Sequence, residues 1–197
     1  MGRIVMSGPQ NVSLDGVVQD PDGKEGFELG GWFVEFGGKD LEAWNQVALD
    51  EALRAEAWLL GRRSYEFFGM RWRPRTGELA DRLNRLPKYV VSSTLEDPEW
   101  DNTTVLKGDV VAEVAKLKQE LDGEIVIPAS YRLGRSLIAH DLVDELRLVV
   151  FPVVLGAGER FFGAVGGKKP LRLAGTRTIG DGLVLLTYEL VRDFEWS

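Results

Sequence analysis

Short apolar runs alternate with helical patterns from the N terminus to about His140, and this alternation limits the fold more than any other feature of the sequence. The apolar runs are 4–6, 57–60, 88–92 and 124–127. The stretches with apolar residues at helical spacing are 40–56, 79–86 and 109–121, and a later one that carries Leu133, Leu137 and Ile138. Strand and helix in alternation are typical of a parallel sheet covered by helices. The sequence therefore predicts an α/β protein.

After His140 the pattern changes from alternation to strands alone. A long apolar run spans 146–155, and two further runs, 171–179 and 183–191, flank Gly180-Asp181-Gly182. Two strand patterns around a glycine-rich turn predict an antiparallel hairpin. We therefore expect a mostly parallel central sheet with antiparallel C-terminal edge strands. Because no repeat or linker interrupts the pattern, we expect a single domain over 1–197, a length that can bury a substantial core.

Polar residues at the predicted helix ends indicate where the helices begin and stop. Asp40 is the expected N-cap of the helix over 40–56, and Ser64 the expected start of a brief helix that ends at Phe68. Asp109 is the expected N-cap of the helix over 110–121. His140 follows a helix, where the helix dipole favours a cation, so a capping role outweighs a catalytic one. Residues 71–77 are expected to form a polar loop.

The composition excludes several kinds of chemistry. The chain has no cysteine and one histidine, which excludes disulfides, thiolate nucleophiles, cysteine-bound zinc and multi-histidine metal sites. A net charge of −7 argues against a general nucleic-acid binder. No apolar run reaches the roughly 18 residues of a membrane span, and the N terminus is too short for a signal peptide. We therefore expect a cytoplasmic protein whose chemistry depends on carboxylates, hydroxyls, backbone amides or a cofactor.

Three strand-to-helix junctions carry polar residues at the edge of the sheet where ligands of α/β proteins bind. At Gly61-Arg62-Arg63-Ser64, a helix N terminus and two guanidinium groups favour a phosphate, although a solvated arginine pair beside a helix cap is the alternative. The hydroxyls of Ser92-Ser93-Thr94 are suited to a phosphate or ribose, or else form a simple turn. Pro128-Ala129-Ser130 opens the third junction, where Ser130 as an ordinary N-cap is the alternative.

Three further groups have open roles. Arg71-Trp72-Arg73-Pro74-Arg75 is a second basic cluster. Asp50 and Glu51 lie on a predicted helix, where one of them could face a ligand, although most such carboxylates are solvated. Four aromatic residues suit either a pocket for a flat substrate or the core, which is the default. They are Trp32, Phe33, Phe36 and Trp44.

The motifs occur in an order that resembles a known family. The series is Ser13-Leu14-Asp15-Gly16, Leu60-Gly61-Arg62-Arg63-Ser64-Tyr65-Glu66, Leu86-Pro87-Lys88-Tyr89-Val90-Val91-Ser92-Ser93-Thr94, Leu142-Val143-Asp144-Glu145-Leu146, Pro152-Val153-Val154-Leu155-Gly156-Ala157-Gly158 and Phe161-Phe162. It resembles the dihydrofolate reductase-like superfamily, and within it the branch similar to the RibD C-terminal reductase domain. The resemblance extends from about Ile4 to Leu190. It implies a dihydrofolate reductase-like three-layer fold and NADPH-dependent hydride transfer, which makes the chain an oxidoreductase.

The resemblance also implies roles for individual residues. The turn at Gly61 would hold the cofactor phosphates, including the 2′-phosphate that distinguishes NADPH from NADH, through Arg62, Arg63 and Ser64. Ser92 and Ser93 would lie near the adenosine end, and Ala129 and Ser130 near the pyrophosphate. Asp15 and Gly16 would belong to the loop beside the nicotinamide, with Asp15 positioning substrate or water.

The resemblance leaves the substrate open. The riboflavin-pathway enzyme reduces 5-amino-6-(5-phosphoribosylamino)uracil, so a pyrimidine or pterin-like substrate is implied, while a zinc deaminase is excluded because its signature is absent. The family has Gly followed by Gly or Ser where this chain has Ala129-Ser130 after Pro128. This departure admits an inactive ligand-binding or regulatory paralogue, and a reductase of unrelated small carbonyls is a third alternative. The long terminal strands suggest a homodimer.

Overall fold

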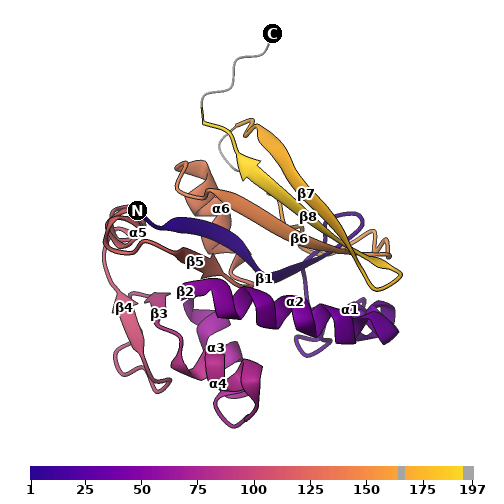
Figure 1. Cartoon of the computed structure of the whole chain (residues 1–197), viewed down its shortest axis with the longest axis horizontal. Helices are drawn as coiled ribbons and strands as arrows, with labels where there is room; N and C mark the ends of the chain where they lie inside the picture. Colours follow the sequence, from indigo (N-terminus) through magenta and orange to yellow (C-terminus); the bar gives the residue numbers. More distant parts are fainter. Residues whose placement is uncertain (164–166, 193–197) are drawn as a thin grey trace.

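The computed structural model describes residues 1–163 and 167–192, and these residues build one eight-stranded sheet (Figure 1). The strand order is β4-β3-β2-β5-β1-β6-β8-β7. The strands are β1 (Arg3–Ser13), β2 (Ala55–Gly61), β3 (Lys88–Val91), β4 (Thr103–Leu106), β5 (Glu124–Ile127), β6 (Glu145–Phe151), β7 (Leu171–Ile179) and β8 (Leu183–Leu190). Pairing is parallel from β4 through β6, whereas β8 and β7 are antiparallel. The predicted mostly parallel sheet with antiparallel C-terminal strands is confirmed.

Helices cover both faces of this sheet. They are α1 (Trp32–Gly37), α2 (Leu41–Arg54), α3 (Arg62–Trp72), α4 (Glu78–Arg85), α5 (Val110–Glu120) and α6 (Tyr131–Ala139), with a short 3₁₀ turn η1 (Gly38–Asp40) before α2. On one face, α5 and α6 pack on residues such as Leu59 and Ile125; on the other, α2, α3 and α4 pack on residues such as Leu60 and Val126. The structure therefore has the three layers of the dihydrofolate reductase-like fold. Within the described residues, no helix is both long enough and apolar enough to cross a membrane.

The sheet opens between β1 and β5. β1 pairs with β5 only as far as Met6, and its register with β6 shifts between Met6 and Gln10. At Gly8, φ is +101°, and a Cβ atom would lie 2.6 Å from the Cβ of Pro128. Glycine is therefore required there, because a side chain would be both strained and in collision. The strands separate beyond this point, at the carboxyl edge where α/β sheets bind ligands.

Two of the predicted N-caps are wrong. Asp40 does precede α2, but its carboxylate caps no helix and accepts hydrogen bonds at 3.0 and 2.7 Å from the amides of Asp181 and Gly182 in the β7–β8 turn. Ser64 does not begin a helix, because α3 already starts at Arg62 and continues to Trp72. The predicted polar loop therefore loses its first two residues to this helix.

Other end-of-helix predictions are confirmed. The Asp109 carboxylate accepts a hydrogen bond from the amide of Ala112 at 2.8 Å, as an N-cap should. His140 is exposed at the end of α6, and its Nδ1 lies 2.8 Å from the carbonyl oxygen of Ser136. Both side chains therefore contact backbone groups at helix ends and are not part of the candidate site described below.

Candidate functional site

A cavity of about 810 Å³ lies where β1 and β5 separate, and we call it the main cavity. Its wall is formed by β1 at 8–11, by the inner face of α2, by α3, and by the turn that leads into α6. Small-molecule sites in proteins occupy roughly 300–1,000 Å³. The main cavity is therefore large enough for an extended ligand such as a dinucleotide with part of a substrate.

Six of the ten predicted site residues line the main cavity. They are Gly61, Arg62, Arg63, Ser64, Ala129 and Ser130. The other four, Asp15, Gly16, Ser92 and Ser93, do not line it. The structure thus brings together the first and third junctions and leaves the second junction and the Asp15 loop outside.

Ser130 ties two of the junctions to each other. Its hydroxyl oxygen accepts a hydrogen bond from the amide of Gly61 at 3.0 Å, and it caps no amide of α6. The reading of Ser130 as a capping side chain is wrong, and the Gly61 amide is not free for a phosphate. Among the described residues, no side chain caps the start of α3 or of α6. The positive ends of two helices therefore face one corner of the cavity.

Arg62 joins this corner to the neighbouring junction. Its Nη1 donates to the hydroxyl of Thr94 at 2.5 Å, and its Nε donates to Glu66 at 2.7 Å. Arg63 is mostly exposed and lies 3.6 Å from Glu25. Arg62 is thus held in place by two partners, whereas Arg63 is an exposed cation at the rim. Thr94 does not line the cavity itself, but it positions Arg62, a role that the resemblance did not imply.

The two serines before Thr94 have a different use. The hydroxyl oxygen of Ser92 accepts hydrogen bonds from the amides of Thr94 and Leu95 at 3.2 and 3.0 Å, and Ser93 is exposed. Ser92 therefore shapes the turn that presents Thr94 to Arg62. The simple-turn alternative describes this serine best.

The turn before α6 keeps a glycine-like backbone without a glycine. Ala129 has φ of +52°, in the left-handed region that favours glycine. The amide of Ser130 donates to the carbonyl of Pro128 at 2.6 Å, and the amide of Tyr131 donates to that of Ala129 at 2.7 Å. Two amides of the turn are thus already bonded, so an anion here would depend on the following amides of α6 and on nearby arginines.

Asp15 has a structural use in the geometry. Its carboxylate accepts hydrogen bonds from the hydroxyl of Ser13 at 2.7 Å and from the amides of Leu155 and Gly156 at 3.1 and 2.9 Å. These bonds, that of Ser13 first, lower the pKa of Asp15 to about 2. The adjacent Gly16 has φ of +83° and completes the turn. Asp15 therefore holds the 155–156 segment, and the geometry lends no support to a role in positioning substrate.

Five arginines line the main cavity of a chain whose net charge is −7, together with the four acidic residues Asp20, Asp22, Glu25 and Glu51. Its five arginines are Arg62, Arg63, Arg71, Arg75 and Arg132. Arg71 and Arg75 belong to the second basic cluster, and their guanidinium groups lie 5.8 and 5.3 Å from the centre of the Trp72 ring. Arginines at helix N termini are typical of sites for phosphate or carboxylate groups. Within the described residues, no group of acidic or histidine side chains could hold a metal ion.

The rest of the cavity wall combines seven aromatic residues with aliphatic and polar ones, and it includes unpaired polar atoms. Phe33 and Trp44, two of the predicted pocket aromatics, line it with their ring centres 4.9 Å apart. Among the described residues, three buried side-chain polar atoms have no hydrogen-bond partner: Gln10 Oε1, Asp22 Oδ2 and Trp72 Nε1. All three belong to residues that line this cavity. Since buried polar groups are normally paired, a ligand or ordered water is expected to complete them.

Glu159 fastens the loop before β7 to the start of α6. Its carboxylate accepts hydrogen bonds from Arg132 at 3.0 Å, from the Tyr131 hydroxyl at 2.8 Å and from Arg135 at 2.7 Å. These contacts, the Arg132 bond first, lower the pKa of Glu159 to about 2. A carboxyl group whose pKa falls on folding stabilises the folded state above its ordinary value and loses that effect as the pH falls towards the lowered value.

Glu159→Gln is therefore expected to be less stable than the wild type by about 1–2 kcal/mol at neutral pH, once solvent screening is taken into account. This difference should shrink on acidification from the ordinary carboxyl value of 4.5 towards 2. Urea unfolding of both proteins over this pH range measures it. A difference that stays constant with pH would show that the ion pairs of Glu159 do not stabilise the fold.

Comparison with known proteins identifies the family. The model of the RibD C-terminal domain family matches residues 10–185. Over 137 residues, the chain is 34% identical to the uncharacterized protein YyaP of Bacillus subtilis (strain 168). The aligned residues make up 66% of this chain and 71% of YyaP. Two solved structures share its fold at low sequence identity.

The first structure is that of a putative riboflavin biosynthesis protein from Shewanella sp. PV-4, with a TM-score of 0.72, 22% identity and coverage of 97% of this chain and 99% of that one. The second is a dihydrofolate reductase from Enterococcus faecalis complexed with NADP(H) and RAB-propyl. Its TM-score is 0.55 at 16% identity, and the match covers 98% of this chain and 97% of that one. The family match covers most of the chain, and the fold agrees with it. The protein belongs to the RibD C-terminal domain family, on a dihydrofolate reductase-like fold.

Proposed function

We propose that the protein is an NADPH-dependent reductase that transfers a hydride to a small pyrimidine-like or pterin-like substrate. One observation carries this proposal: five arginines and two uncapped helix N termini meet in a cavity whose wall also includes seven aromatic side chains. NADPH has the matching chemistry, since it combines phosphate groups with flat rings. The dihydrofolate reductase of similar fold, complexed with NADP(H), supports the choice of cofactor.

The residues present fit the cofactor at its adenosine end best. Arg62 is fixed by Thr94 and Glu66 at the start of α3, where a 2′-phosphate would receive both a guanidinium and helix amides. Arg63 stands beside it with most of its side chain exposed. The pyrophosphate would lie between the starts of α3 and α6. NADH has no 2′-phosphate, so this corner would discriminate between the two cofactors.

Bound NADPH would supply the hydride, and the chain would supply binding, orientation and exclusion of water. This division suits a protein without cysteine and with one histidine. The aromatic wall at Phe33 and Trp44 would accept a flat ring by stacking. The family and the similarity to a putative riboflavin biosynthesis protein support 5-amino-6-(5-phosphoribosylamino)uracil as the first substrate to test.

A second candidate function is a ligand-binding protein without reductase activity. The bonded amides of Ser130 and Tyr131 favour it, because they are withdrawn from a pyrophosphate. On this alternative the main cavity binds its ligand but never consumes NADPH.

Calorimetric titration with NADPH and with NADH tests the proposal. We expect NADPH to bind at least about tenfold more tightly than NADH, a difference of about 1.4 kcal/mol. Failure of both to bind at millimolar concentration would reject the reductase. If NADPH binds, its oxidation with the uracil substrate and with a dihydropterin, followed by absorbance, separates the reductase from the binding protein. Binding without oxidation favours the second candidate.

A further inference from the structure

Glu51 is a buried carboxyl group that neither the family match nor the cofactor site uses. It lies on α2, is 2% exposed, and lines the floor of the main cavity. It also lines a second, smaller hollow of about 220 Å³, which Arg147 and Arg177 border on the other side. One side chain therefore separates the proposed substrate cavity from a second hollow that charged residues line.

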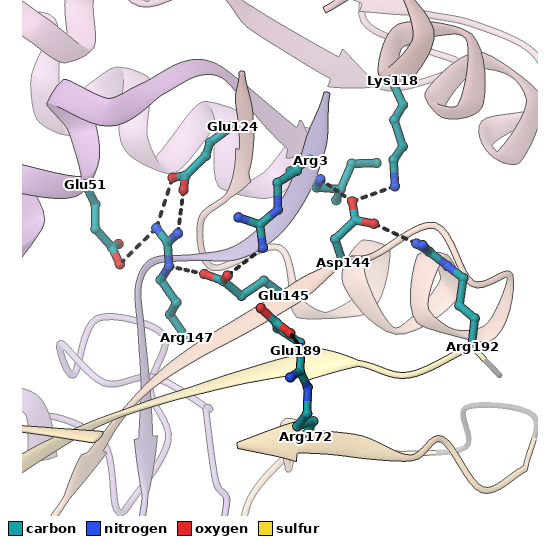
Figure 2. A network of polar contacts seen from close by, with 11 residues as sticks. Arg3, Glu51, Lys118, Glu124, Asp144, Glu145, Arg147, Arg172, Glu189 and Arg192 are labelled. Atoms are coloured by element: carbon teal, nitrogen blue, oxygen red, sulfur yellow. Dashed lines mark hydrogen bonds and ion pairs between the residues drawn. The ribbon is translucent and has the colours of Figure 1, made fainter. Parts of the chain in front are cut away.

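The contacts of Glu51 are mostly neutral. The Ser7 hydroxyl lies 2.7 and 2.6 Å from its two carboxyl oxygens, and the amide of Gly8 donates to it at 2.9 Å. Its nearest cation, Nη1 of Arg147, is 3.7 Å away (Figure 2). A hydroxyl at this distance can either donate to a carboxylate or accept from a carboxylic acid.

Arg147 is shared with two closer carboxylates. Its Nη2 lies 2.6 Å from Glu124 and its Nε 2.5 Å from Glu145, as Figure 2 shows. The Glu145 carboxylate also forms an ion pair with Nη2 of Arg3 at 2.8 Å. If all three glutamates were ionised, three negative charges would share the two cations that contact them, Arg147 and Arg3. Arg54 is a third cation that acts on Glu51 and Glu124, but it is exposed to solvent, which screens its charge.

An unbalanced charge in the interior is costly, so one carboxyl group is expected to be neutral. Glu51 is the farthest of the three from Arg147 and the most buried. The remaining ionisable neighbours, Asp50 and Arg54 on α2 and Arg177 on β7, border the smaller hollow and are partly or fully exposed. Burial also raises the pKa of Glu51, against the opposing effects of the Ser7 hydroxyl, Arg147, the Gly8 amide and Arg54.

We propose that Glu51 is a carboxylic acid at neutral pH and donates the proton that completes the reduction. This inference rests on the proposed function. When a carbon of a C=N or C=O bond in the substrate accepts the hydride of NADPH, the π electrons move to the heteroatom, which takes the Glu51 proton. The products are the reduced substrate, NADP⁺ and the Glu51 carboxylate. A proton taken up from bulk solvent and relayed through the smaller hollow then restores the Glu51 carboxylic acid, so that each turnover consumes one NADPH and one solvent proton.

A carbon-13 NMR titration of glutamate side-chain carboxyl groups tests the protonation state without any ligand. Comparison with Glu51→Gln assigns the Glu51 signal, and sequential assignment in the wild type replaces this comparison if the variant fails to fold. We expect Glu51 to titrate above neutral pH. A Glu51 signal that is already that of the carboxylate at neutral pH would overturn the proposal, whether or not NADPH binds.

Single-turnover kinetics test the proton transfer. Glu51→Gln is expected to slow the reduction by about 10²- to 10⁴-fold, the usual contribution of a general acid, with NADPH affinity unchanged. The wild-type rate should fall as Glu51 ionises at alkaline pH, and the variant should lose that dependence. Glu42→Gln, which removes an exposed carboxylate on the same helix, is the matched control and should keep the wild-type rate and pH profile. A wild-type rate in Glu51→Gln contradicts the proposal; failure of NADPH to bind the wild type contradicts the proposed function instead.

Discussion

Replacement of Arg62 by alanine is expected to weaken NADPH binding by about 10- to 100-fold while changing NADH binding by less than about threefold. Arg62 is held at the start of α3 by Glu66 and Thr94, so its guanidinium group meets a phosphate in a fixed geometry. A charge-assisted hydrogen bond contributes about 1.5–3 kcal/mol, which sets the size of the loss. NADH has no phosphate at this place and should lose little.

Calorimetry with both cofactors on the variant and the wild type measures this effect. Arg73→Ala is the matched control, because Arg73 ends the same segment, pairs with Glu99 at 2.8 Å and does not line the main cavity. It should leave both affinities unchanged. Equal losses for NADPH and NADH in Arg62→Ala would show that Arg62 does not recognise the 2′-phosphate.

Replacement of Arg147 by methionine is expected to lower the free energy of unfolding by about 3–5 kcal/mol. Arg147 is buried between β5, β6 and α2, and it pairs with Glu124 and with Glu145, which Arg3 also contacts (Figure 2). These carboxylates hold the pKa of Arg147 above its ordinary value. Methionine fills a similar volume, so most of the loss would come from the partly buried Glu124, which loses its bidentate partner, and from the buried Glu145, which keeps only Arg3.

Urea unfolding of the variant at neutral pH measures this loss. Arg172→Met is the matched control, since Arg172 pairs with Glu189 but is 72% exposed, and exposed ion pairs contribute about 0–1 kcal/mol. A change in Arg147→Met no larger than that of the control would mean that the buried network is not a stabilising unit.

The fold was largely predictable because its strands and helices have strong local patterns. The buried strands β2 and β5 read as apolar runs, and α5 has both an apolar stripe and a capping aspartate. β4 was missed because it is a four-residue edge strand whose residues are half-buried or exposed, which leaves no apolar run. α1 was missed because it has six residues and two glycines at its ends.

The long apolar run after His140 was only partly a strand. β6 ends at Phe151, and the following residues join a turn whose amides at Leu155 and Gly156 are held by Asp15, 140 and 141 positions earlier in the chain. Asp40 was read as a cap for a similar reason, because its partners in the β7–β8 turn are 141 and 142 positions away. Pairs so distant in the chain have no signature in one sequence.

The candidate site also has one part that the local sequence indicates and another that only long-range packing creates. The Gly61-Arg62-Arg63-Ser64 junction was predictable because a strand, a glycine and a helix start follow one another locally. The part of the wall at Gln10 and Glu51 was not, since it depends on where β1 separates from β5 and on α2 packing over that opening. Glu51 in particular looks like any helix carboxylate until Ser7 and Arg147 are placed around it.

The most direct test of the central claim is a crystal structure of the protein with NADP⁺ bound in the main cavity. We predict that the 2′-phosphate lies within hydrogen-bond distance of Arg62, with the pyrophosphate between the starts of α3 and α6. Density for the nucleotide elsewhere on the protein, or with its adenosine end away from residues 61–64, would contradict the assignment of this cavity as the site of an NADPH-dependent reductase.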